Sequence, residues 1–142
     1  MSTPSSDRSS VTCTGPEPVF VDLSTETVGF KGELVISPYD NNQTCRFVLL
    51  GGEGGPGSSR YFDLLAGSVF DTEEIFDVVR VYYADETGAR LTVSPLATLS
   101  GVRSAGSVLA SAPTFPGLLV EFKSDESITG DGAIIQYELK ER

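Results

Sequence analysis

The chain has 142 residues, of which 39% are hydrophobic, and its 10 Lys and Arg against 20 Asp and Glu give a formal net charge of −10. This length suits one domain with a buried core, and no apolar run is long enough to span a bilayer. The acidic balance disfavours nucleic acid and anionic membrane surfaces as partners, and it favours cations and basic proteins. Because the chain has no His, Ser-His-Asp catalysis, Cys-His catalysis and His-liganded metal sites are excluded.

The N-terminal stretch "MSTPSSDRSSVTC" is polar and rich in Ser. It has no apolar segment of the kind found in a signal peptide, so the sequence is expected to be a mature chain or fragment behind a start Met, or a cytosolic protein. Residues 1–12 offer little surface to bury and are predicted to be a disordered tail. A single folded domain is predicted over residues 13–142.

Short segments with strand patterning follow one another through the rest of the chain. They are "VFVDL" (19–23), "GELVIS" (32–37), "CRFVLL" (45–50), "YFDLLAGSVF" (61–70), "VVRVYY" (78–83), "RLTVS" (90–94), "SVLA" (107–110), "GLLVEFK" (117–123) and "AIIQYEL" (133–139). Several alternate apolar and polar residues at period two, which indicates half-buried strands. Gly- and Pro-rich turns separate them, and no helical periodicity is sustained. The chain is therefore predicted to be all-β, an antiparallel sandwich of jelly-roll type with about nine or ten short strands.

Two cysteines, Cys13 and Cys45, cannot hold a structural zinc by themselves. They either form one disulfide or remain as two reduced, buried thiols. The disulfide is favoured, together with secretion, because the sequon "NQT" at Asn42 also fits an extracellular, glycosylated chain.

Two motif-like stretches are rejected as sites. "GGEGGPGSSR" (51–60) has the glycine spacing of a phosphate loop, but Ser58 stands where the Lys belongs and strands flank it on both sides. "DESITG" (125–130) imitates the start of an EF-hand loop, but Gln136 stands where the bidentate Glu belongs. Pairs of acids that would suit glycoside hydrolysis are plentiful and none is marked, so the chain is not predicted to be an enzyme.

A calcium site of another kind is suggested by two acidic stretches. "FDTEEIFD" supplies Asp71, Glu73, Glu74 and Asp77, and "SDESITGD" supplies acids and hydroxyls after a later strand. Hard cations take several oxygen ligands from separate loops, and loops at one end of a sandwich converge. The alternative is that the two stretches lie at opposite ends of the molecule or are simply solvated.

Four segments in this order resemble the CUB domain, an extracellular jelly-roll module. They are "CTG…GELVISPYDNNQTC", "CRFVLL", "FDTEEIFDVVRVYYADETG" and "LLVEFKSDESITGDGAIIQY", which cover roughly residues 13 to 138. The last carries the most specific pattern, hydrophobic-x-Phe-x-Ser-Asp-x-Ser. Where CUB domains commonly carry a second disulfide, this chain has Ile75 and Ser100-Gly101.

The resemblance implies a set of calcium ligands. Asp77 matches the Asp of an aromatic-Asp pair and Asp125 the Asp of Ser-Asp-x-Ser, and Ser127 lends an oxygen. The first acid of the family's set is Asp71 or Glu74, with Glu73 a further candidate on the binding rim. Tyr39 is the possible counterpart of the family's Tyr.

The function predicted in this way is a non-enzymatic extracellular binding module, stabilised by calcium. Its acidic end loops would recognise Lys or Arg of a basic protein, or a glycan. The alternative is a structural β-sandwich subunit of a particle, capsid or matrix, which would assemble through its sheet surfaces without a metal.

Overall fold

The computed structural model describes residues 8–13, 17–23, 25–36, 43–51, 60–72, 77–114, 117–124 and 132–141. Within these ranges the regular secondary structure consists of ten β-strands, with no helix. None of the described residues forms a helix that is long and apolar enough to cross a membrane.

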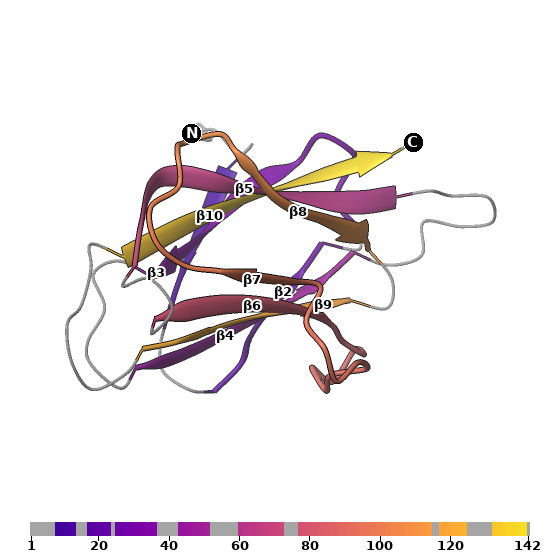
Figure 1. Cartoon of the computed structure of the whole chain (residues 1–142). Coiled ribbons are helices and arrows are strands. Elements are labelled where there is room, and N and C mark those ends of the chain that lie inside the picture. Colours follow the sequence, from indigo (N-terminus) through magenta and orange to yellow (C-terminus); the bar gives the residue numbers. More distant parts are fainter. Residues whose placement is uncertain are drawn as a thin grey trace.

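The strands form two five-stranded sheets that face each other (Figure 1). The first sheet has the order β1-β3-β10-β5-β8. Its strands are β1 (Arg8–Thr12), β3 (Lys31–Ile36), β10 (Gly132–Glu141), β5 (Arg60–Asp71) and β8 (Val108–Pro113). The second sheet has the order β2-β4-β9-β6-β7. Its strands are β2 (Val19–Asp22), β4 (Thr44–Leu50), β9 (Leu118–Lys123), β6 (Val78–Tyr83) and β7 (Ala97–Leu99).

The core lies between the sheets and is built from the apolar positions of the period-two patterns. Val79 and Val81 on β6 and Val120 on β9 point inward and are fully buried. On β10 the inward positions are Ala133, Ile135, Tyr137 and Leu139, all of them buried. The prediction of a sandwich is therefore confirmed. All strand pairs are antiparallel except β1–β3 and β2–β4, the pair at one edge of each sheet, which are parallel.

A disulfide between Cys13 and Cys45 joins the two sheets, because Cys13 directly follows β1 and Cys45 lies on β4. The predicted bridge is thus present, and the alternative of two reduced thiols is wrong. Cys45 is fully buried in the core, and Cys13 packs against it.

Three segments differ from the sequence-based expectation, and one of them is β7 (Ala97–Leu99), a short strand that was not predicted. Arg8–Thr12, assigned to the disordered tail, forms β1 and pairs with β3 from Arg8↔Lys31 to Thr12↔Val35. As an edge strand, β1 is held by backbone hydrogen bonds to its single neighbour β3. Val11 is the only apolar residue of β1 and packs against the core, so the strand has little apolar patterning in its sequence. The ordered part of the chain therefore begins earlier than predicted.

The third difference is "RLTVS" (90–94), which does not form a strand. Only Arg90 makes an isolated bridge, to Ala84, and the following residues bend away from the sheet. Val93 is 94% exposed, so its alternation with polar neighbours does not mark a buried face. Pro95 has no N–H to donate to a ladder, which is consistent with an irregular connection between β6 and β7.

Candidate functional site

Strands of both sheets begin or finish at the end of the sandwich that lies on the left in Figure 1, which we call the convergent end. At this end β9 finishes and its neighbours begin, as the register pairs Thr44↔Lys123 on β4–β9 and Val78↔Lys123 on β6–β9 show. In the other sheet β3 and β5 finish here and β10 begins, with Ile36 opposite Ala133 and Asp71 opposite Gly132. The end of β5, the start of β6, the end of β9 and the start of β10 therefore lie at the same end.

Asp77 immediately precedes β6 and is fully buried, with 0% of its surface exposed. Burying a carboxylate in this way requires compensation by hydrogen bonds or by a cation. Asp77 is therefore not an acid that is merely solvated at the surface. Asp125 itself lies outside the described residues, two positions beyond Lys123, the register partner of Val78.

Asp71 is the last residue of β5 and is half-buried. It pairs with Gly132 on one side and makes an isolated bridge with Val102 on the other. The next residue, Thr72, fixes this strand end, because its N–H donates to Gly101 O (3.0 Å) and its Oγ1 accepts from Gly101 N–H (3.0 Å). These contacts hold Asp71 at the convergent end.

Gln43 and Ser124 form a brace at the same end that the sequence analysis did not identify. The Gln43 N–H donates to Ser124 Oγ (2.8 Å), and the Ser124 N–H donates to Gln43 O (2.9 Å). The side-chain amide of Gln43 also donates to the sulfurs of Cys13 and Cys45, at 3.3 and 3.4 Å. The disulfide thus anchors the residue that precedes Asp125. Ser124 lies in the "FKSDES" signature, which could have pointed to it, whereas nothing local marks Gln43.

Six of the predicted site residues lie outside the described part of the chain: Tyr39, Asn42, Glu73, Glu74, Asp125 and Ser127. Among the residues that are described, no group of three or more acidic or Cys side chains is arranged to hold a metal ion. Asp71 and Asp77 are the two predicted ligands whose positions the structure gives.

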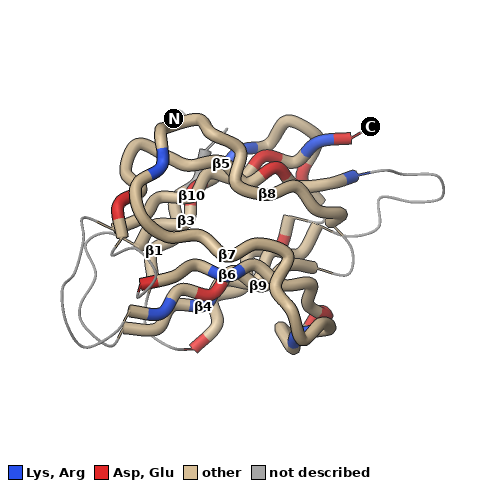
Figure 2. Tube along the Cα trace, in the orientation of Figure 1, with Lys and Arg blue, Asp and Glu red and all other residues tan. Residues whose placement is uncertain are grey.

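The charged residues are spread over both sheets (Figure 2). By register and hydrogen bonding, the described charged residues of the convergent end include Asp71, Asp77, Lys123 and Arg103. A hollow of about 460 Å³ lies beside Asp71, lined by Thr72 and residues 100–103. Arg103 is its one charged lining residue, so this hollow does not suit a cationic side chain.

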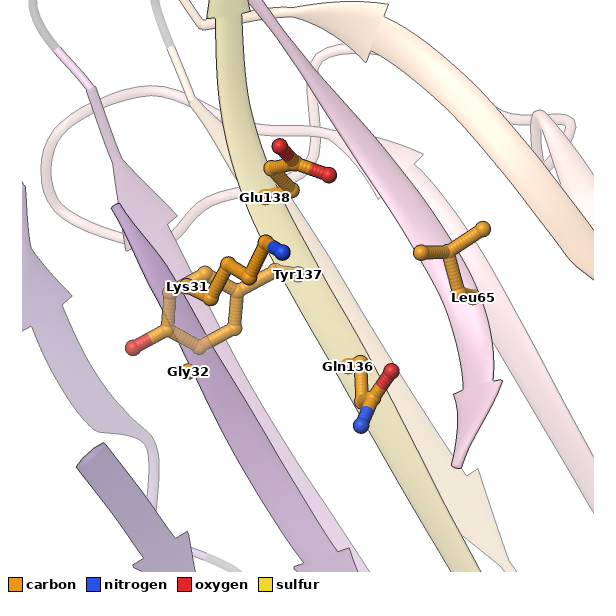
Figure 3. Close-up of a pocket in the computed structure, with 6 residues that line it drawn as sticks. All are labelled: Lys31, Gly32, Leu65, Gln136, Tyr137 and Glu138. Atoms are coloured by element: carbon orange, nitrogen blue, oxygen red, sulfur yellow. The ribbon is translucent and has the colours of Figure 1, made fainter. Parts of the chain in front are cut away.

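A smaller pocket, of about 80 Å³, lies over β3, β10 and β5. In Figure 3 the Lys31, Gln136 and Glu138 side chains stand round it, while the Tyr137 ring lies beside Gly32. Ligand pockets usually hold roughly 300–1,000 Å³. This pocket is therefore a feature of strand packing around Gly32.

Comparison with solved structures identifies the fold. The human MASP-1/3 CUB1-EGF-CUB2 structure matches 91% of this chain with a TM-score of 0.59 and 16% identity. The MASP-1 CUB2 domain bound to Ca²⁺ matches 78% of it with a TM-score of 0.54 and 17% identity. The full extracellular region of zebrafish Gpr126/Adgrg6 matches 88% of it with a TM-score of 0.56 and 20% identity.

The chain therefore has the fold of a CUB domain, as its sequence motifs suggested. It covers 94% of the isolated MASP-1 CUB2 domain, but only 43% of the human MASP-1/3 fragment and 15% of the zebrafish region. No family model and no curated protein matches the sequence.

Proposed function

We propose that this protein is a non-enzymatic extracellular interaction module whose convergent end loops bind one calcium ion. The observation that supports this most strongly is the register pair Val78↔Lys123. This pair places the start of β6, which directly follows Asp77, beside the end of β9, which precedes Asp125 by two residues. A site that needs oxygen ligands from separate loops is therefore compatible with the topology.

Asp77 and Asp125 are the principal ligands in this proposal, and Ser127 lends a further oxygen. Either Asp71 or Glu74 completes the set, and of these two Asp71 is held at the end of β5 beside Gly132. Carboxylate and hydroxyl oxygens are the donors that calcium prefers. The MASP-1 CUB2 domain, which shares the fold, was solved bound to Ca²⁺.

The bound ion orders the end loops for a partner. Two or more acids held together by calcium leave carboxylate oxygens on the rim, and these attract the ammonium group of Lys or the guanidinium of Arg. Tyr39 and Glu73 are the rim residues assigned to this contact. A loop that is already ordered loses less conformational entropy on binding, which strengthens the contact with a basic protein, or with a glycan.

An extracellular location accounts for two further features. The Cys13–Cys45 disulfide persists in an oxidising compartment. The sequon at Asn42 would be glycosylated in the same compartment.

The binding of a Lys-bearing peptide tests this function. The wild-type protein should bind the peptide in millimolar calcium and release it when a chelator is added. It should not bind the same peptide with its Lys acetylated, because acetylation removes the charge. Asp125→Asn should weaken binding about tenfold or more.

Glu86→Gln is the matched control, since it also removes one acid but from the exposed turn beyond β6, at the opposite end of the strand. This variant should bind like the wild type. If Asp125→Asn and Glu86→Gln weaken peptide binding equally, or if the wild type binds the peptide equally well with and without calcium, the end loops are not the binding site. Assembly that depends on concentration and not on calcium would favour the structural-subunit alternative.

A further inference from the structure

The outward face of the β2-β4-β9-β6-β7 sheet carries a group of cations, although the whole chain is strongly acidic. Arg46 on β4, Glu121 on β9 and Arg80 on β6 occupy one lateral row, as the pairs Arg46↔Glu121 and Arg80↔Glu121 show. Lys123 stands on the same face, two residues further along β9. Blue segments on neighbouring strands of the lower sheet gather around red ones in Figure 2.

Arg90 extends this group of cations. Its guanidinium carbon lies 4.7 Å from the centre of the Tyr82 ring, a cation–π contact. Tyr82 is the next outward residue of β6 after Arg80, so the guanidinium of Arg90 covers the same face. We call Arg46, Arg80, Arg90 and Lys123 the basic face.

Among the described residues, the acids near the basic face pair with Arg46 but leave Arg80 and Lys123 outside any ion pair. Glu121 is the one acid at the described outward positions of β4, β9 and β6, and it accepts a hydrogen bond from Arg46 Nε at 2.9 Å. Asp85, in the turn that carries Arg90, accepts from Thr87 and Ala89, and these hydrogen bonds, those of Thr87 foremost, lower its pKa and keep it anionic, so it is a negative charge at the border of the basic face. Glu86 in the same turn and Asp22 on β2 are exposed at the border.

The neighbouring apolar row of this sheet is already covered. Val48, Leu119 and Tyr82 form a small buried cluster on the outward side. The turn after β6 lies over it, since a Cβ on Gly88 would meet Val48 at 3.1 Å. At the edge of the row Phe20 remains 48% exposed. The accessible surface of the basic face is thus polar and charged, with Arg80 and Lys123 outside any described ion pair, and it lacks the apolar centre of a typical protein–protein interface.

We propose that the basic face binds a sulfated polysaccharide. Neighbouring strands lie about 4.8 Å apart, so Arg46 and Arg80 are separated by about 10 Å, and Lys123 lies about 7 Å further along its strand. An open array of this kind suits a linear polymer with repeated anionic groups, which contacts several cations at once and releases counterions. This proposal does not depend on the calcium site, because none of its residues is a proposed calcium ligand, although Lys123 ends β9 at the same end of the sandwich.

Retention on immobilised heparin, a sulfated polysaccharide, tests the proposal. The double variant Arg80→Gln/Lys123→Gln should elute at a lower salt concentration than the wild type and bind soluble heparin about tenfold more weakly. The control variant Lys31→Gln/Arg103→Gln removes two exposed cations elsewhere and should elute like the wild type. Arg46 is left intact because it pairs with the buried Glu121.

Three results would overturn the proposal. The first is that the wild type is not retained at low salt. The second is that both double variants, folded as judged by wild-type Tm, lose retention equally, because net charge alone would then explain it. The third is retention on polyglutamate but not on heparin, which would point to an acidic protein as the partner. The wild-type protein should still be retained on heparin after a chelator has removed calcium. This result would distinguish heparin binding by the basic face from binding that requires the calcium site.

Discussion

At the scale of single residues, the packing of β10 against β3 depends on the absence of one side chain. Gly32 lies opposite Tyr137, and an added Cβ would sit 2.1 Å from Tyr137 Oη and 2.2 Å from its ring carbon Cζ. Tyr137 is among the largest fully buried side chains of the core, and its ring centre lies 6.4 Å from that of Phe30. Gly32 therefore provides the space that a large core residue occupies.

Gly32→Ala should lower the free energy of unfolding by roughly 1–3 kcal/mol, because overpacking forces Tyr137 out of its position. Urea denaturation of the two proteins measures this difference. In a Tyr137→Leu background the same Gly32→Ala change should cost clearly less. An equal cost in both backgrounds would show that the contact with Tyr137 is not the cause.

At the scale of the elements, period-two alternation predicted the central strands well, because each has one face in the core. "VVRVYY" corresponds to β6 residue for residue. The edge strand β1 was missed because its sequence, "RSSVT", has no apolar alternation. "RLTVS" was misread as a strand because apolar and polar residues also alternate on exposed loops. The Gln43–Ser124 brace and the basic face were not predicted, since each joins residues far apart in the chain.

The disulfide is the element-scale link between the two sheets. Cys13 and Cys45 are 32 residues apart in sequence. In the chain-entropy picture, closing a loop of this length stabilises the fold by about 3–4 kcal/mol. Cys13→Ser/Cys45→Ser should lose about this much in urea denaturation.

Reduction of the wild-type protein is the companion measurement. Its stability should fall to that of the double variant, and a thiol count on the unreduced protein should find none free. Free thiols, or a double variant as stable as the wild type, would contradict the role of this bridge.

At the scale of the whole molecule, net charge alone gave an incomplete picture. The acidic balance of −10 predicted attraction to cations and basic partners, but it concealed a face where Arg80 and Lys123 stand near Arg46. The fold was predictable because the motifs resemble a CUB domain and occur in the right order. The proposed calcium site is less accessible to sequence reasoning, because which loops converge depends on strand order. The register now puts the segments of Asp77 and Asp125 on neighbouring strands.

Calorimetric titration of the protein with calcium tests the central claim most directly. The wild type should bind one ion per chain and show a Tm that rises in millimolar calcium and falls with a chelator, because a ligand that binds only the folded state stabilises it. Asp77→Asn and Asp125→Asn should abolish the shift, whereas Glu86→Gln should retain it. A wild-type protein without calcium heat and without a Tm shift would contradict the account, as would full binding in both Asp variants.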